Sequence, residues 1–578
     1  MNGGEFLVRT LTQEDVFTPE DFSEEHRAVR KTVDDFWRNE AEPVLDRIAH
    51  KDHDAAVALL RKSCELGLAG VVAPEAYGGM EMDLTSALIV AEGLARDGSY
   101  AAWHGAHAGI GTLPVLLFGT EEQKRRYLPR LLSGELIGAY ALTEPHAGSD
   151  ALAARTRADL SPDGAHYVLN GSKMWITNAG KADLFTVFAK IGGDAAKFTA
   201  FLVERDSAGL TIGHEEAKMG IQGSSTCAVY FDNVRVPAAN LLGEIGRGHI
   251  IAFNILNLGR LKLGPFAVGA AKQVLKASAS YAQERQAFGG AIARFGLIQA
   301  KLADMAIRTF AAESLSYAVC GFIESRLKDF SWSAPDAARA KLKAIEEFAA
   351  ECSMVKVYAS EALDFVVDEG VQIHGGFGYH QDYLVERAYR DARINRIFEG
   401  TNEINRLLAT GMLLKRAMRG RLDLVGAVKR VQAALLAPPA AGARPEPAQA
   451  AKQITLLALG AAYARFRDQL EQQQEVLAAL TDAAMGALTM ECVSLRATRL
   501  RGTAKAELAG DVASVFNDTT LRAVEDAARL ALCASREGDE LRVSLAALKR
   551  LAKQEPVDLV SARRRIAARV LEAGGWIF

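Results

Sequence analysis

The sequence predicts a mostly helical protein with a central β-barrel domain. Helical patterning persists to about residue 134, strand-like alternation replaces it from about Tyr140, and long helices return from Ile250. The 578 residues suffice for three or four domains. The predicted boundaries are 1–138 for an N-terminal helical domain, 139–249 for the barrel, 250–418 for a helical bundle, 419–447 for a linker and 448–578 for a C-terminal helical domain.

The N-terminal region contains clear helix starts and one break. Thr18-Pro19-Glu20-Asp21, followed by Ser23, places a proline and acidic side chains in a first turn. Ala73 to Gly79 is rich in turn residues, and Thr120 is positioned as the N-cap of a new helix. We therefore expect this region to be entirely helical.

The middle region contains short runs of β-forming residues. Phe185 to Phe188, Phe198 to Val203 and Ala228 to Pro237 are bounded by glycine and aspartate turns. Several short strands at fairly even spacing favour a small barrel or a sandwich.

The second half is helical, with breaks at Gly375 to Gly378 and at Phe398 to Gly400. Leu436 to Pro447 carries four of the chain's 15 prolines and is expected to be an irregular linker. Beyond it, helices are predicted at about 448–500, 505–535 and 541–573, with a break at Pro556.

Charge and cysteine content exclude several classes of function. Lys and Arg total 68 against 71 for Asp and Glu, which gives no electrostatic reason to expect a nucleic-acid partner. The six cysteines form no Cys-x-x-Cys pair, which argues against a structural zinc site or a disulfide framework. No targeting segment and no unbroken apolar window of about 18 residues is seen, so a cytoplasmic location is expected.

The end of the chain leaves two interpretations open. Arg563, Arg564, Arg565 and Arg569 precede a terminal Trp576-Ile577-Phe578. This mixture suits peripheral contact with an anionic membrane. It equally suits a solvated basic face with an apolar tail docked on a partner subunit.

Glu399 is the candidate general base. It lies between the apolar pair Ile397-Phe398 and Gly400, and desolvation raises the pKa of a carboxylate toward the range useful for proton abstraction. The alternative is an ordinary helix-entry loop, with Thr401 or Asn402 as N-cap and Glu403 favoured by the helix dipole.

Two segments at strand ends are candidate binding loops. Tyr140 to Asp150 and Asn170 to Gly180 combine hydroxyl groups with glycines, and Trp175 offers a flat apolar wall for an aromatic cofactor. As isolated segments they are equally compatible with hairpin turns.

Other chemistry lacks support. Gly375-Gly376-Phe377-Gly378 does not match G-x-G-x-x-G, and neither a Walker motif nor a G-x-S-x-G serine is found. His104 and His107 have no third ligand at a recognisable spacing, so no metal site is predicted.

Five motifs taken in order resemble the acyl-CoA dehydrogenase family over about residues 20–415. They are Thr143 to Asp150, Trp175 to Asn178, Arg285 to Gly289, Gln372 to Gly378 and Ile397 to Thr401. The resemblance implies a helical domain, a β-barrel and a four-helix bundle, here followed by an extra C-terminal helical domain. It also implies FAD as the cofactor and Glu399 as the catalytic base.

The resemblance assigns further roles residue by residue. The implied cofactor-binding residues are Tyr140, Leu142, Thr143, Gly148, Ser149, Trp175, Ile176, Thr177, Arg285, Phe288, Gln372, Gly375, Gly376, Thr401 and Glu403, some of which reach across a subunit interface. The implied substrate-binding residues are Ser149, Asn257, Arg260, Phe398 and Gly400.

The implied reaction removes an α-proton and a β-hydride from an acyl-CoA in fatty acid β-oxidation, and gives a trans-2-enoyl-CoA. Gly296 stands where shorter relatives place a glutamine, and with the extra C-terminal region this is similar to the very-long-chain branch, which implies a homodimer. Gly111 is a candidate for admitting a long acyl tail, with Pro114 nearby. An electron-transfer flavoprotein is the expected acceptor. The alternatives are an acyl-CoA oxidase using oxygen, or a fold-retaining assembly protein acting through the C-terminal domain.

Overall fold

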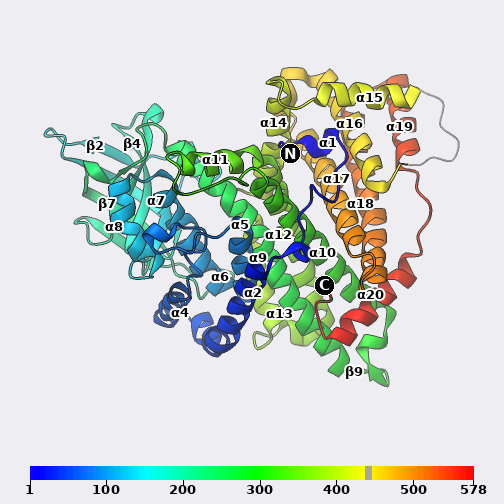
Figure 1. Ribbon diagram of the computed structural model, residues 1–578, viewed down its shortest axis with the longest axis horizontal. Coiled ribbons are helices and arrows are strands. Elements are labelled where there is room, and N and C mark those ends of the chain that lie inside the picture. Colours follow the sequence, from blue (N-terminus) through cyan, green and yellow to red (C-terminus); the bar gives the residue numbers. More distant parts are fainter. Residues whose placement is uncertain (437–444) are drawn as a thin grey trace.

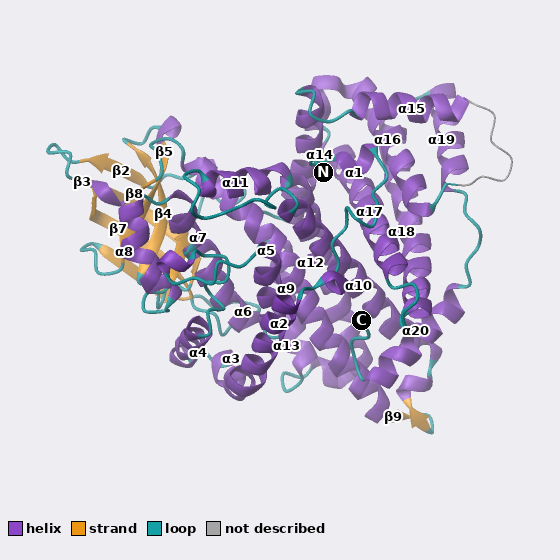
Figure 2. Cartoon of the chain, in the orientation of Figure 1, coloured by secondary structure: helices purple, strands orange, loops and turns teal. Residues whose placement is uncertain are grey.

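A sheet-containing region lies at one end of the molecule, with helices making up the rest (Figures 1 and 2). The computed structural model describes residues 1–436 and 445–578. The N-terminal helices are α1 (Glu5–Val8), α2 (Glu24–Phe36), α3 (Leu45–Ala49), α4 (His53–Glu65), α5 (Leu84–Leu94), α6 (Gly98–Gly105), η5 (Ala106–Gly111), α7 (Leu113–Phe118) and α8 (Glu121–Leu132). Their starts follow local chemistry: Ser23 Oγ accepts from the His26 N–H, and Thr120 Oγ1 accepts from the Gln123 N–H, which confirms the predicted N-cap at Thr120.

The middle region is an eight-stranded sheet. Its strands are β1 (Gly138–Ala141), β2 (Arg157–Leu160), β3 (His166–Thr177), β4 (Leu184–Ile191), β5 (Phe198–Glu204), β6 (Leu210–Glu215), β7 (Thr226–Pro237) and β8 (Leu241–Leu242). They pair in the order β6-β7-β3-β2-β4-β5-β8, and β1 adds to β4 in parallel.

The predicted barrel needs one correction. Within the described residues no pairing joins β6 to β8, so the strands form an open sheet and not a closed barrel. The physical reason is the shortness of the edge strand β8. It is two residues long and, among the described strands, pairs with β5 alone, so it offers too few backbone hydrogen bonds to close the sheet into a barrel.

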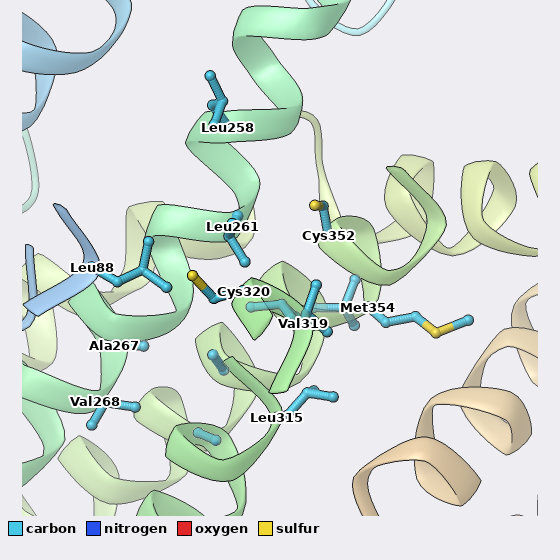
Figure 3. Close-up of a cluster of buried hydrophobic side chains, with 14 of the residues drawn as sticks. Leu88, Leu258, Leu261, Ala267, Val268, Leu315, Val319, Cys320, Cys352 and Met354 are labelled. Carbon is cyan, nitrogen blue, oxygen red and sulfur yellow. The ribbon is translucent and has the colours of Figure 1, made fainter. Parts of the chain in front are cut away.

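The bundle contains α9, the longest helix of the described residues. Its elements are α9 (Gly248–Glu284), β9 (Gln286–Ala287), β10 (Gly290–Ala291), α10 (Gly296–Glu324), α11 (Ala337–Glu347), α12 (Ala349–His374), α13 (Leu384–Ala392) and α14 (Asn402–Met418). Figure 3 shows part of the core, where buried side chains of α9, α10 and α12 gather, among them Leu261, Val319 and Met354. This packing fixes the helices that carry the site.

The C-terminal helices are α15 (Leu424–Leu436), α16 (Pro447–Phe466), α17 (Gln474–Arg499), α18 (Ala506–Ser535), α19 (Gly538–Ala552) and α20 (Leu559–Ala573). The predicted helical segments and the break at Pro556 are confirmed. The predicted linker is partly wrong, because α15 occupies 424–436 and buries Leu424, Ala427 and Val431 at helical spacing. Residues 437–444 of that prediction lie outside the described part of the chain.

The C-terminal tail docks on its own chain. The rings of Phe578 and Phe310 lie 4.5 Å apart, and the Lys272 ammonium lies 4.8 Å from the Trp576 ring. Three of the nearby arginines are paired within the chain, Arg563 with Asp304 at 2.7 Å, Arg565 with Asp511 and Arg569 with Glu572 at 2.7 Å. The alternative of an apolar tail docked on a partner subunit is therefore corrected: the tail packs against α9 and α10.

One described helix, α17, is long and apolar enough to cross a membrane, and 89% of its apolar window is buried inside the protein. A buried core helix passes the same length and composition test, so this is weak evidence for a span.

Candidate functional site

The loop that carries Glu399 has an unusual backbone. Glu399 (φ 58°) and Gly400 (φ 82°) both adopt left-handed conformations between α13 and α14. A non-glycine residue in this region costs on the order of 1 kcal/mol or more, and such strain persists only where surrounding contacts hold it. Trp175 (φ 57°) and Phe288 (φ 50°) share this property, so three of the predicted site residues are strained.

Side chains from three helices hold the loop by its carbonyl oxygens. Arg260 Nε of α9 donates to Glu399 O at 3.0 Å. Lys356 Nζ of α12 donates to Gly400 O at 2.7 Å, and Asn405 Nδ2 of α14 donates to the same oxygen at 2.8 Å. The predicted substrate contact Arg260 thus also serves the backbone of the catalytic loop, and it bonds Asn257 Oδ1 at 3.0 Å.

The carboxylate itself is desolvated. Glu399 Oε2 is buried and has no hydrogen-bond partner within the described residues. Burial raises the pKa of Glu399 to about 7, and the positive charges of Arg260 and Lys356 lower it from what burial alone would give. A carboxylate with a pKa near neutrality is suited to general-base catalysis.

The helix-cap interpretation coexists with a catalytic one. Thr401 Oγ1 accepts from the Ile404 N–H at 3.3 Å, which makes Thr401 the N-cap of α14. The Glu399 N–H donates to no group in the described parts of the chain. Glu399 therefore offers a carboxylate base and a free backbone donor at one place.

A cavity of about 1870 Å³ gathers most of the predicted site residues. Those that line it are Tyr140, Leu142, Thr143, Gly148, Ser149, Trp175, Ile176, Thr177, Asn257, Arg260, Phe398, Glu399, Gly400 and Thr401. The strand-end loops of the sheet and the helices of the bundle thus form two walls of one cavity.

The two predicted binding loops are joined to each other. Met174 N–H donates to Thr143 O at 2.9 Å, and Lys173, whose side chain is completely buried, pairs with Glu144 at 2.7 Å. The pairing of β3 with β7 shifts register between Lys173 and Ile176, which is the irregularity that brings Trp175 to the surface. Trp175 is 59% exposed and lines the cavity.

The remaining predicted cofactor residues lie outside this cavity. Arg285, Phe288, Gln372, Gly375, Gly376 and Glu403 are all exposed. Phe288 is 90% exposed on the β9–β10 hairpin, and the Arg285 guanidinium lies 5.4 Å from the Phe377 ring. In Figure 2 this hairpin lies at the opposite side of the bundle from the sheet. One chain therefore does not bring all predicted cofactor residues together.

A second cavity, of about 170 Å³, meets the first at Glu399 and Thr177. Small residues of α6 and η5 form one wall, among them Gly105 and Gly109. A β-carbon at Gly109 would meet nothing within 4 Å. The prediction for Gly111 is wrong: a β-carbon there would lie 2.7 Å from the Gly138 backbone, so Gly111 faces β1 and not the cavity.

The opposite wall is a stripe along α9. Gly259 packs against the Glu399 carboxylate, and Lys262, Phe266, Ala270 and Val274 continue the lining at helical spacing. The 15 residue steps from Gly259 to Val274 correspond to about 22 Å of helix. The cavity thus extends far beyond the carboxylate.

Sequence reasoning missed several residues that shape the site. Gly105, Gly109 and Lys356 lie outside the recognised motifs. Gly259 and Asn405 lie beside residues already singled out, Arg260 and Glu403, but no spacing rule assigns them a role. Residues one or two positions apart on a helix point to different faces, so the sequence offers no signal that would have found them.

Family profiles match most of the chain. "Acyl-CoA dehydrogenase, N-terminal domain" matches residues 23–135, the middle domain 139–234 and the C-terminal domain 246–413. A further profile described as "Acyl-CoA dehydrogenase, C-terminal domain" matches 450–550.

Some individual proteins match over nearly the full length, and others match over part of it. A "Probable acyl-CoA dehydrogenase" of Bacillus subtilis is 45% identical over 99% of this chain and 98% of its own. The rat mitochondrial very long-chain specific enzyme is 42% identical over 62% of this chain and 52% of its own. The crystal structure of an acyl-CoA dehydrogenase complexed with FAD from Bacillus anthracis covers 100% of both chains with a TM-score of 0.97 at 46% identity.

Proposed function

The chain belongs to the acyl-CoA dehydrogenase family, and from that premise we propose that it oxidises long-chain acyl-CoA thioesters to trans-2-enoyl-CoA in fatty acid β-oxidation, with Glu399 as the base. The observation that carries the proposal is the desolvated carboxylate at the junction of two cavities, one lined by predicted cofactor residues and one lined mostly by small and apolar side chains.

The residues of the larger cavity fit FAD. Trp175 presents an exposed indole to the cavity, Tyr140 Oη is a buried hydroxyl with no hydrogen-bond partner among the described residues, and a β-carbon at Gly148 would meet open space. These features suit a flat aromatic ring with polar edges. Thr177 and Thr401 also line the cavity and would hold its polar groups. The chemistry that bound FAD supplies is the acceptance of a hydride from the β-carbon.

Glu399 performs the proton transfer. Its carboxylate takes the α-proton of the thioester, and the raised pKa makes it a stronger base than an exposed glutamate. The free Glu399 N–H donates toward the thioester oxygen, where negative charge develops as the proton leaves. Phe398 lines both cavities beside the carboxylate and limits the access of water.

The acyl cavity supports a long-chain preference. Its lining follows α9 from Gly259 to Val274, which corresponds to about 22 Å of helix. Its wall at Gly109 leaves room that a larger side chain would fill.

A homodimer is proposed from the exposed group of cofactor residues. Phe288 and Gly375 are exposed at a distance from the cavity that holds Trp175. An aromatic ring that is 90% exposed and strained in φ is expected to have a function outside its own chain. We therefore place this group in the cofactor site of a second subunit.

An electron-transfer flavoprotein is the proposed electron acceptor. In the alternative, the protein is an oxidase and oxygen accepts the electrons. Anaerobic titration of the purified yellow protein with acyl-CoAs from short to very long tests the reaction and its chain-length preference together. Bleaching that is strongest with long chains supports the proposal. Absence of bleaching overturns it, and stoichiometric peroxide under air would assign the oxidase.

A further inference from the structure

Lys356 lies beneath the catalytic loop and outside every motif recognised in the sequence. Its side chain is completely buried on α12. Lys356 Nζ donates to Gly400 O at 2.7 Å and to Asn402 Oδ1 at 2.6 Å. It thus joins the residue after the catalytic carboxylate to the first residue of α14 through two charge-assisted hydrogen bonds.

We propose that Lys356 is a positioning residue for Glu399 and that a chain of hydrogen bonds from the C-terminal helical domain fixes it in place. The inference rests on the proposed function, because it takes Glu399 as the base. It assigns to the extra domain a part in the geometry of the active site.

The connection runs through three side chains. Asn402, which is 2% exposed, donates through Nδ2 to Glu361 Oε1 at 3.0 Å. Glu361 accepts both terminal nitrogens of Arg406, at 2.7 and 2.9 Å. Arg406 Nε donates to Asp482 of α17 at 2.7 Å, and Thr481 Oγ1 donates to Arg406 O at 2.6 Å. The path is continuous from the C-terminal domain to Gly400.

The strained backbone of the catalytic loop needs these hydrogen bonds to keep its conformation. Glu399 and Gly400 adopt positive φ, so the loop relaxes unless its carbonyls are held. Replacement of Lys356 by an apolar residue leaves two buried acceptors, on Gly400 and Asn402, without this donor. A displacement of the carboxylate by about 1 Å is enough to lower the rate about a hundredfold.

Lys356 also acts on Glu399 through its charge. The charged groups that influence the Glu399–Lys356 pair are Arg260 on α9, Glu361 on α12 and Glu403 on α14. Burial and the Glu399 charge raise the pKa of Tyr140 on β1, which keeps that phenol neutral. The Lys356 ammonium lowers the pKa of Glu399 relative to burial alone, while burial lowers the pKa of Lys356 to about 7. Removal of the ammonium therefore raises the pKa of Glu399.

The test uses the FAD-loaded full chain and a Lys356→Met variant. We expect the acid limb of flavin bleaching to move up by about one pH unit or more, and the rate at the alkaline plateau to fall about tenfold or more, with KM little changed. A second readout, independent of activity, is the infrared band of the protonated Glu399 carboxyl, which is identified by its loss in Glu399→Gln. We expect the midpoint of its pH titration to move up in Lys356→Met by the same amount as the acid limb of bleaching. Lys341→Met removes a buried lysine on α11 that lies over the Phe330 and Trp332 rings, and is the matched control.

Two further variants separate charge from geometry and test the domain connection. Lys356→Arg keeps the charge, so the midpoint stays near that of the wild type while the plateau rate falls. Asp482→Asn lowers the plateau rate about threefold, whereas Asp526→Asn on the exposed surface of α18 leaves it unchanged. If Lys356→Met does not fold, Lys356→Arg and Asp482→Asn test the proposal by the same rate and titration measurements.

Outcomes that overturn the proposal are distinct from failure of the proposed function. If the wild type bleaches but Lys356→Met and Lys356→Arg keep its rate and its pH profile, Lys356 does not position Glu399. If Asp482→Asn equals Asp526→Asn, the C-terminal domain does not contribute. If the wild type itself does not bleach with any acyl-CoA, the proposed function fails, while the infrared titration still reports on the Glu399–Lys356 pair.

Discussion

The carboxylate of Glu399 packs against the backbone of Gly259: a β-carbon at residue 259 would lie 2.7 Å from Glu399 Oε2 and 2.8 Å from Cδ. Contacts below 3.0 Å force one partner to move. Helix α9 therefore sets the position of the base from one side, as the Lys356 ammonium holds its loop from another.

Gly259→Ala should slow the reaction without unfolding the protein. The added methyl displaces the carboxylate, and we expect the rate of flavin bleaching to fall about tenfold to a hundredfold. Stopped-flow absorbance measures this rate, and FAD content checks the fold. Gly411→Ala in α14 is the control, since a β-carbon there meets nothing within 4 Å. A Gly259→Ala enzyme as fast as this control would contradict the packing argument.

Glu399→Gln should stabilise the folded chain at high pH. The folded-state pKa of Glu399, about 7, lies above its ordinary value of 4.5. A carboxyl with a raised pKa contributes its full stability below the unfolded pKa and loses it as pH rises through the folded pKa. The wild type then loses up to about 3 kcal/mol between pH 4.5 and pH 8, whereas glutamine does not titrate. Urea unfolding of both apoproteins at pH 5 and pH 8 measures the difference; a gap that does not widen with pH refutes it.

Gly109→Leu should shorten the accepted acyl chain. The new side chain occupies the acyl cavity, where a β-carbon at 109 meets open space. We expect kcat/KM for palmitoyl-CoA to fall about a hundredfold or more and that for butyryl-CoA to change little. Gly510→Leu in α18, also without a neighbour within 4 Å, is the control. Equal losses for both substrates would show that the cavity does not hold the acyl tail.

Phe288→Ser should weaken cofactor binding and association of subunits. The exposed ring is the largest apolar group of the β9–β10 hairpin, and burial of a phenylalanine contributes about 1.5–3 kcal/mol. We expect FAD affinity to fall at least tenfold. We also expect light scattering to show that the subunits dissociate at a higher protein concentration than those of the wild type. Val543→Ser removes an exposed apolar side chain on α19 and serves as the reference. Unchanged FAD affinity would remove Phe288 from the shared site.

Features fixed by local chemistry were predictable from the sequence. The caps at Ser23 and Thr120, the change from helix to strand and back, and the burial of Glu399 beside Phe398 all depend on neighbouring residues. The recognised motifs located most of the larger cavity, because each motif is a short loop at the end of a regular element.

Features that depend on packing between distant segments were not predictable. Gly111 and Gly109 are two residues apart, yet only one faces the acyl cavity, because η5 turns the other against β1. Closure of the sheet depends on the two-residue β8. The helix α15 ends before the prolines and packs against α16, a contact between segments that the local sequence does not signal. Lys356 has no local signal at all, since its partners are 44 and 46 residues away.

The most direct test of Glu399 as the base is anaerobic mixing of palmitoyl-CoA with the wild type and with Glu399→Gln, both loaded with FAD, at pH 8. We expect the wild-type flavin absorbance to bleach and the variant to bind the substrate but remain yellow, with a rate lower by a factor of about 10⁴ or more. Bleaching of the variant at the wild-type rate would contradict the central claim.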